Sequence, residues 1–287
     1  MKQIIIATFL LLLFSFAVFA QTAPQEKTAT VFGAKIYYLE AGDAAKPTVV
    51  LLHGLGSSVV SWQLNIAALS QKYHVVALDQ IGFGKSDKPF LKYRVGTYAD
   101  FLDKFMSETK IEKATLVGNS LVGWVAALTA IKYPNRVEKI VLANAAGLKP
   151  GEIDLKQIYG LNYSTRDEVR TLLKRVFYNQ AIFGSEAFVE ESMRQRVLVN
   201  DGYTINSLIE SIKREEDFLN LQLGQIKQPA LIIWGKQDGL LPISDAQTFK
   251  AGIPNSQLII FDQCGHAPQI EKASDFNATV LKFLEGK

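Results

Sequence analysis

Short apolar runs, each followed by a polar segment that often contains glycine, alternate with helical patterns along most of the chain. Runs of this kind are typical of strands that a parallel sheet buries on both faces. The predicted buried strands are Thr48–Leu52, His74–Leu78, 115–117, 137–142, 229–234 and 257–261. An opening hairpin is predicted over 30–39, and helical spacing predicts helices over 61–71, 97–110 and 276–284. We therefore expect an α/β fold, with a mostly parallel, twisted sheet flanked by helices.

Between residues 148 and 227 the strand signals disappear and charged amphipathic helices replace them. Thr165 and Glu168 have the spacing of a capping box, and Ser185 precedes a second helical pattern. We expect this insertion after the sixth strand to form a lid over the carboxyl edge of the sheet and to line a substrate pocket. An ordinary helical subdomain with no role in a pocket is the alternative. The α/β core then comprises residues 28–147 and 228–287.

The amino terminus has the pattern of a signal peptide. Lys2 precedes the uncharged apolar run 4–19, and small residues at Val18 and Ala20 offer a cleavage site. Residues 1–20 are therefore expected to be removed and residues 21–27 to form a flexible leader. The protein would then be exported, periplasmic or secreted, with no stable membrane insertion after cleavage. An uncleaved membrane anchor is the alternative, since the run is only slightly shorter than a span of about 17–25 residues.

Charge and cysteine content exclude several classes of function. The net charge is +3, and outside residues 1–20 there are 30 basic and 28 acidic residues. This balance, with no basic stripe, argues against a nucleic-acid partner. Cys264 is the single cysteine, so no intramolecular disulfide is possible. No cluster of histidine, cysteine and carboxylate residues has the spacing of a metal site.

Candidate chemistry begins at the segment 114–133, where an apolar run leads into Gly118-Asn119-Ser120-Leu121-Val122-Gly123 and then into a helical pattern. A serine at the apex of a sharp strand-to-helix turn is a nucleophile elbow. Glycines flank such a turn because its backbone is strained and the strand and helix approach closely. Ser120 is therefore the candidate nucleophile, although an ordinary turn that contains serine has the same appearance.

A second glycine-containing loop, His53-Gly54-Leu55-Gly56, follows the strand Thr48–Leu52. In a serine hydrolase with an elbow, one oxyanion donor comes from this loop and another from the residue after the nucleophile. We assign these donors to the backbone N–H groups of Leu55 and Leu121.

A base and an acid follow at the ends of later strands. Of the three histidines, His266 alone lies on a loop after the final predicted strand, and Asp238 follows the preceding one. Ser120, Asp238 and His266 thus occur in the order serine, acid, histidine, which is one of the orders of a catalytic triad. Asp262 lies too near His266 in the chain to be the first choice of acid. Asp79 is a further candidate acid, but a carboxylate at a strand end is more often structural, and we expect it to cap the glycine-rich loop that follows it.

Two other polar residues near strand ends receive no catalytic role. Asn144 follows the strand 137–142, so no carboxylate is available there to serve as the acid. Glu271 is expected to favour the start of the closing helix.

These segments resemble the α/β-hydrolase family over almost all of the chain after residue 27. The resemblance rests on HGLG (53–56), DQIGFGKSDKP (79–89), GNSLVG (118–123), WGKQDGLLP (234–242) and CGHAPQIE (264–271). Within the family the chain looks most like monoacylglycerol lipases and carboxylesterases, and like the hydrolases that cut carbon–carbon bonds in meta-cleavage products. Serine at position 120 argues against the branches whose nucleophile is a carboxylate.

Three residues depart from the family pattern. Val122 stands where a small residue is usual in the elbow. The resemblance to carbon–carbon hydrolases implies a tryptophan after the catalytic histidine and a lid arginine for the substrate carboxylate. This chain has Ala267 and Ser192 at those positions, with Arg194 and Arg196 nearby.

The sequence therefore predicts an exported serine hydrolase that cleaves small or medium acyl esters without a cofactor. Monoacylglycerols are one candidate class of substrate. Hydrolysis of a carbon–carbon bond is the enzymatic alternative. A non-hydrolytic ligand-binding protein on the same fold is the alternative of another class. The acyl length, the alcohol group and the oligomeric state are not determined by these patterns.

Overall fold

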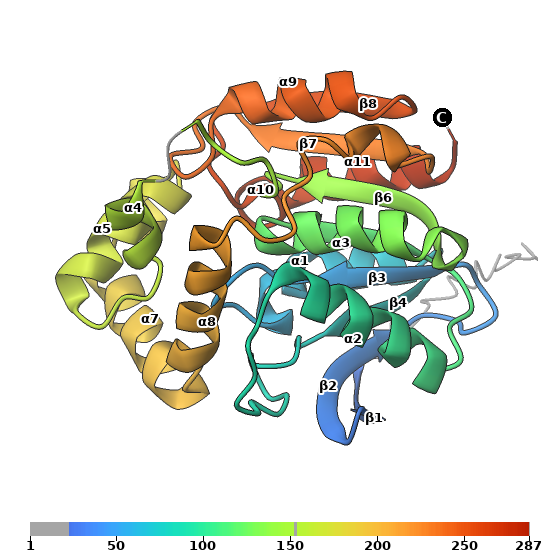
Figure 1. The fold of residues 1–287 in the computed structure, drawn as a ribbon, viewed down its shortest axis with the longest axis horizontal. Helices are drawn as coiled ribbons and strands as arrows, with labels where there is room; N and C mark the ends of the chain where they lie inside the picture. The colour runs from blue at the N-terminus through green and yellow to red at the C-terminus, as the bar shows by residue number, and fades with distance from the viewer. Residues whose placement is uncertain (1–22, 152–153, 287) are drawn as a thin grey trace, which may run out of the picture.

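One eight-stranded sheet forms the centre of the protein (Figure 1). The computed structural model describes residues 23–151 and 154–286, so the expected signal peptide lies outside the described residues. The strand order is β1-β2-β4-β3-β5-β6-β7-β8. Strands β1 and β2 form an antiparallel hairpin, β2 is antiparallel to β4, and β3 to β8 are parallel. The strands are β1 (Gln25–Val31), β2 (Ala34–Ala41), β3 (Thr48–Leu52), β4 (His74–Leu78), β5 (Ala114–Asn119), β6 (Val137–Ala143), β7 (Ala230–Gly235) and β8 (Ser256–Phe261).

Helices cover both faces of this sheet. The core helices are α1 (Gln63–Ser70), α2 (Val95–Glu108), α3 (Leu121–Lys132), α9 (Ile243–Gly252), α10 (Pro268–Glu271) and α11 (Ala273–Leu284). Apolar residues of α2, α3 and α9 belong to the hydrophobic cluster on one face of the sheet, and those of α1 and α11 belong to the cluster on the other. The predicted α/β class and the mostly parallel sheet are therefore confirmed.

The insertion between β6 and β7 is helical and lies beyond the carboxyl ends of the parallel strands (Figure 1). Its helices are α4 (Leu155–Tyr159), α5 (Arg166–Val176), α6 (Gln180–Phe183), α7 (Glu186–Val199) and α8 (Gly202–Lys213). Thr165 and Glu168 form the predicted capping box of α5, and Ser185 caps α7. These helices have a small apolar cluster of their own around Val169, Leu173 and Phe177.

The hairpin begins earlier than the sequence predicts. Residues 25–27, expected in the flexible leader, lie in β1 and pair with residues 38–40 of β2. This segment is polar because β1 is the edge of the sheet and exposes much of its surface. Ion pairs fit that exposed position: Lys27 pairs with Glu40, and Glu26 pairs with Lys85 at 3.0 Å. The leader boundary at residue 27 is therefore wrong.

Smaller differences concern helix boundaries. The helix expected over 97–110 is α2, which begins at Val95 and ends at Glu108. The segment expected as one helix over 61–71 divides into a 3₁₀ turn (Val59–Trp62) and α1. Within the described ranges 23–151 and 154–286, none of the helices combines the length and apolar character that crossing a membrane requires.

Candidate active site

Ser120 lies at the turn between β5 and α3, with backbone angles φ 62° and ψ −128°. A positive φ is strained for a residue other than glycine and persists only where neighbouring structure enforces it. Here Ser120 N–H donates to Ala143 O (3.0 Å) and Ser120 O accepts from Ala146 N–H (3.0 Å). The serine is therefore held in the elbow geometry by hydrogen bonds to the last residue of β6 and to the loop that follows it.

Glycine is required on both sides of this turn. A Cβ atom on Gly118 would lie 2.3 Å from Val122 O, and one on Gly123 would lie 2.5 Å from Ala145 Cβ. Val122 is completely buried and belongs to the main hydrophobic cluster. The close contact of the elbow thus falls on Gly123, and the bulky Val122 side chain is accommodated in the core.

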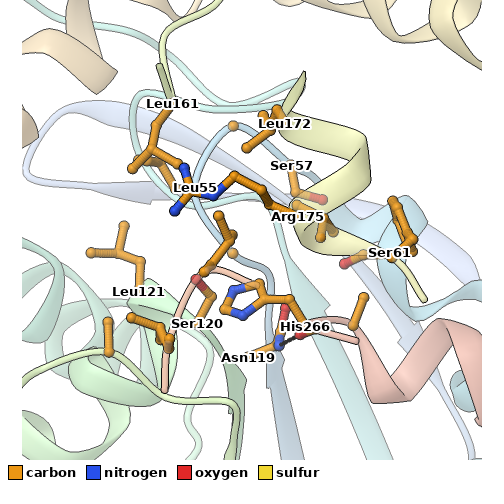
Figure 2. Close-up of a pocket in the computed structure, with 18 of the residues that line it drawn as sticks. Leu55, Ser57, Ser61, Asn119, Ser120, Leu121, Leu161, Leu172, Arg175 and His266 are labelled. Carbon is orange, nitrogen blue, oxygen red and sulfur yellow. Dashed lines mark hydrogen bonds between the residues drawn. The ribbon is translucent and has the colours of Figure 1, made fainter. Parts of the chain in front are cut away.

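His266 and Asp238 meet beside Ser120. The His266 Nδ1 and Asp238 Oδ2 atoms lie 2.7 Å apart, and both side chains are nearly buried. His266 Nε2 is buried and has no hydrogen-bond partner within the described part of the chain. When Nδ1 donates its proton to Asp238, Nε2 is the free acceptor. Figure 2 shows the ring next to the Ser120 side chain, so the structure brings together the three predicted residues.

Asp238 is held by several donors besides His266. Asn144 Nδ2 donates to Asp238 Oδ2 (2.6 Å), and the Leu240 N–H donates to Oδ1 (2.7 Å). Burial alone would raise the pKa of Asp238, but the charge of His266 and these hydrogen bonds outweigh burial and lower that pKa below its usual value. Asp238 is therefore a carboxylate suited to orienting an imidazole.

Asn144 is a site residue whose role sequence reasoning missed. Its Oδ1 accepts from Gly235 N–H (3.1 Å) while its Nδ2 donates to Asp238. The sequence signal for this role was its position directly after β6, the neighbour of β7. The carboxyl ends of adjacent parallel strands meet at one edge of the sheet, which brings Asn144 near Asp238.

The loop 53–56 lies against the nucleophile. A Cβ atom on Gly54 would be 3.4 Å from Ser120 Cβ, and the labelled Leu55 and Leu121 lie near Ser120 in Figure 2. Leu121 begins α3, and the first N–H groups of a helix have no partner within it. Leu55 and Leu121, the predicted oxyanion donors, therefore both lie beside the candidate nucleophile.

His53, the first residue of this loop, connects it to the chain after β4. Its Nε2 accepts from Gln80 N–H (3.0 Å), and its ring is completely buried. Burial lowers the pKa of His53 despite the opposing charges of Asp79 and Asp201, so the ring is a neutral structural group.

The remaining carboxylates considered in the sequence are separate from the triad. Asp79 accepts from the N–H groups of Val59 and Lys85, both at 2.7 Å, and thereby holds two loops, as expected of a structural residue. Asp262 is exposed and accepts from Gln237 Nε2 (2.9 Å).

Glu271 makes contacts that the sequence did not predict. Expected to favour the closing helix, it instead accepts hydrogen bonds from Gly265 N–H (2.8 Å) and Tyr178 N–H (2.8 Å). The carboxylate therefore joins the loop that carries His266 to the lid.

A cavity of about 1080 Å³ lies over Ser120 and His266. Its floor includes Ser120, His266 and Leu55, and the lid residues Val169, Leu172, Leu173, Phe177, Phe183 and Phe188 line much of its wall. Arg175 also lines the cavity, and Figure 2 draws its side chain above Ser120 and His266 in that view. The insertion thus contributes to the pocket, as predicted, and its contribution is largely apolar.

Arg196 provides a charged group in this cavity. It pairs with the buried Asp201 at 2.5 Å, its guanidinium lies 4.2 Å from the centre of the Tyr163 ring, and its Nε has no partner among the described residues. A Cβ atom on Gly56 would be 3.2 Å from the guanidinium. The basic group therefore lies beside the loop 53–56, one helical turn beyond Ser192.

The other residues compared with the carbon–carbon hydrolases, Ser192, Arg194 and Ala267, make local contacts. Ser192 Oγ donates to Phe188 O (2.7 Å), and the exposed Arg194 pairs with Glu191 (2.7 Å). Ala267 is buried in the lid's apolar cluster. Across residues 23–151 and 154–286 there is no group of three or more histidine, cysteine or carboxylate side chains that could hold a metal ion.

Comparisons with known proteins show which family has this fold. Residues 47–273 match the family described as alpha/beta hydrolase fold. The 2-hydroxy-6-oxononadienedioate/2-hydroxy-6-oxononatrienedioate hydrolase of Paraburkholderia phymatum is 33% identical over 267 residues, covering 87% of this chain and 91% of that protein. The meta-cleavage product hydrolase of Pseudomonas fluorescens has a similar structure, with a TM-score of 0.83 at 27% identity, covering 91% of this chain and 97% of its own. A bacterial membrane phospholipase A has a TM-score of 0.81 at 28% identity, covering 92% and 86%.

Proposed function

Because this chain belongs to the α/β-hydrolase family, we propose that it is a serine hydrolase that cleaves carboxylic esters of small or medium acyl groups through an acyl-enzyme. The observation that carries the proposal is the buried His266 Nε2, which lies beside Ser120 at the floor of a largely apolar cavity and has no hydrogen-bond partner among the described residues. An imidazole nitrogen that is free to accept is what makes a serine hydroxyl nucleophilic.

In the proposed reaction Ser120 Oγ attacks the ester carbonyl and His266 Nε2 takes its proton. Asp238 keeps the imidazole in the correct tautomer and stabilises the imidazolium. The N–H groups of Leu55 and Leu121 stabilise the oxyanion. His266 then protonates the leaving alcohol, and water attacks the acyl-enzyme by the same route in reverse.

The lid supports ester cleavage of apolar acyl groups. Phe177, Phe183 and Phe188 pack against one another, with ring centroids 4.0–5.8 Å apart, and all three line the cavity. Burying an acyl chain against such a wall stabilises the complex by roughly 0.8 kcal/mol per methylene group. Ala267 and Ser192, which replace the tryptophan and arginine expected of a carbon–carbon hydrolase, favour the same proposal.

The second candidate is hydrolysis of a carbon–carbon bond in a vinylogous diketo acid. The names of the relatives support this reaction better than they support ester cleavage. Arg196 adds a structural argument, because its guanidinium lies in the cavity and could bind a substrate carboxylate. A binding protein without turnover is the remaining candidate.

Labelling and substrate panels distinguish these candidates. The full chain and its Ser120→Ala variant are treated with a fluorophosphonate, and the adduct is located by mass spectrometry. Both are also assayed with p-nitrophenyl esters of increasing acyl length and with a ring-fission diketo acid. Ser61→Ala is the matched control, because Ser61 also lines the cavity but donates to Ser58 O.

An adduct on Ser120 and ester turnover that is lost only in Ser120→Ala support the proposal. Faster turnover of the diketo acid than of every ester supports the second candidate. For that candidate the test is the double variant Arg196→Gln with Asp201→Asn, which removes both partners of the ion pair and leaves no unpaired buried charge. It is expected to raise KM for the diketo acid and to leave KM for neutral esters unchanged. If the fluorophosphonate forms no adduct on Ser120, both proposed reactions are contradicted.

A further inference from the structure

One segment of the lid is bonded to both loops of the triad. It comprises the end of α5 and the turn that follows, residues 175–179, and is called the α5 end segment below. Gly239 N–H, next to Asp238 in the chain, donates to Arg175 O (3.0 Å). His266 N–H itself donates to Val176 O (2.6 Å). The lid backbone therefore holds the acid loop and the histidine loop at the same time.

Glu271 adds a side chain to this connection. Its Oε1 accepts from Gly265 N–H (2.8 Å), and its Oε2 accepts from Tyr178 N–H (2.8 Å) and Asn179 N–H (3.3 Å). Hydrogen bonds to a charged acceptor are about twice as strong as those between neutral groups. One carboxylate thus bridges the residue before His266 and the α5 end segment.

The backbones at this connection are too close for any side chain between them. A Cβ atom on Gly265 would lie 2.3 Å from Val176 O, and one on Gly239 would lie 2.8 Å from Arg175 O. Such contacts leave the α5 end segment little freedom to shift without moving the two loops. Glu271 adds side-chain hydrogen bonds to the two backbone hydrogen bonds of this contact, and the two glycines allow the backbones to approach.

We infer that Glu271 is a positioning residue for the serine reaction proposed above, on which this inference rests. By fixing the His266 loop to the α5 end segment, it keeps the His266 ring in register with Asp238 on one side and Ser120 on the other. Glu271 touches neither substrate nor the reacting atoms. The lid is therefore part of the frame that aligns the triad, in addition to forming the pocket wall.

Glu271→Gln tests the inference. An amide has one oxygen for the three N–H donors and turns an NH₂ group towards the others, so the bridge is broken at nearly unchanged volume. We expect kcat per active site to fall about 10- to 100-fold, the equivalent of about one hydrogen bond to a charged group. KM for p-nitrophenyl acetate is expected to stay within about twofold, since the pocket is unchanged. Active sites are counted by fluorophosphonate titration, so unfolded protein does not enter kcat.

Glu168→Gln is the matched control. Glu168 also accepts from two backbone N–H groups of the lid, those of Ser164 (2.8 Å) and Thr165 (3.0 Å), but at the opposite end of α5. It is expected to lower Tm while leaving kcat per active site unchanged. Equal losses of kcat in both variants, or an unchanged kcat in Glu271→Gln, would overturn the inference.

Two further results keep the test decisive. If Glu271→Gln does not fold, Glu271→Asp is measured in the same way, because it keeps the charge but shortens the side chain by one methylene. A wild-type kcat in Glu271→Asp overturns the inference, and a reduced kcat at unchanged KM supports it. If the wild-type protein itself is not labelled at Ser120, the proposed function fails, which is a different outcome from a labelled enzyme that is indifferent to Glu271.

Discussion

Asn144 and His266 donate to the same oxygen of Asp238, Oδ2, at 2.6 and 2.7 Å. The amide thus shares the acceptor that orients the imidazole and helps to keep that carboxylate ionised. Asn144 also has φ 44°, in the left-handed region that glycine adopts without strain. Replacing Asn144 by glycine therefore removes the hydrogen bond to Asp238 without straining the backbone at this position.

We therefore expect Asn144→Gly to reduce kcat about 10- to 100-fold, because a hydrogen bond to a charged group is lost without added backbone strain. The rate should also decline at a higher pH than in the wild-type protein when the solution is acidified, since one of the groups that lowers the pKa of Asp238 is gone. Measurement of kcat against pH with an ester substrate checks both expectations. A profile that superimposes on the wild-type one would show that the amide is dispensable.

The elbow contact predicts a pair of compensating substitutions. Gly123→Ala places a methyl group 2.5 Å from Ala145 Cβ and is expected to destabilise the protein by about 1–3 kcal/mol. Combining it with Ala145→Gly removes the opposing methyl group and should restore part of that loss. Urea unfolding of the two single variants and the double variant measures the coupling; free energies that simply add would contradict the contact.

Asp245 lines the cavity, and burial together with the charge of Asp238 raises its pKa to about 6. Because this value lies above the 3.8 of an ordinary aspartate, the folded state binds the proton more tightly. Stability from this group is therefore greatest at low pH and is lost as pH rises from about 4 to 6. Asp245→Asn should raise stability at pH 7.5 by about 1 kcal/mol after allowance for solvent screening, with no gain at pH 4. Thermal unfolding at the two pH values checks this, and an equal gain at both would point to another cause.

Export is the remaining proposal, and it depends on residues 1–20. In a bacterial host with two membranes, the protein is expected in the periplasm or medium with Gln21 as its first residue. Cell fractionation and amino-terminal sequencing test this directly. A variant with Ala20→Leu should retain the whole segment and stay with the membrane, whereas an intact Met1 on soluble wild-type protein would contradict the proposal.

Local patterns were sufficient for the sheet, the lid and the three triad candidates, because each depends on short apolar runs or on residues that follow them. The edge strand β1 was partly missed, since its exposed position requires few apolar residues. Asn144 and Glu271 were misjudged for a different reason. Their partners lie 94 and 93 residues away in the chain, at Asp238 and Tyr178, and only the packing of strand ends and lid reveals the contacts.

The lid arginine shows a similar limit. Matching by position gives Ser192, but the arginine of α7 that lines the cavity is Arg196, four residues later. Residues four apart share one face of a helix, so a basic group can serve the same pocket from a neighbouring turn. The rotation and depth of a lid helix follow from tertiary packing, here the pairing of Arg196 with Asp201.

The direction of β1 determines which side of the molecule faces a support attached at the amino terminus. Because β1 and β4 are both antiparallel to β2, β1 runs in the same direction as the parallel strands and Gln25 lies at the edge of the sheet opposite the lid. A bead, a fusion partner or a cell surface attached just before Gln25 would therefore be remote from the cavity. Immobilisation through the amino terminus therefore places the lid and the cavity on the side of the molecule away from the support.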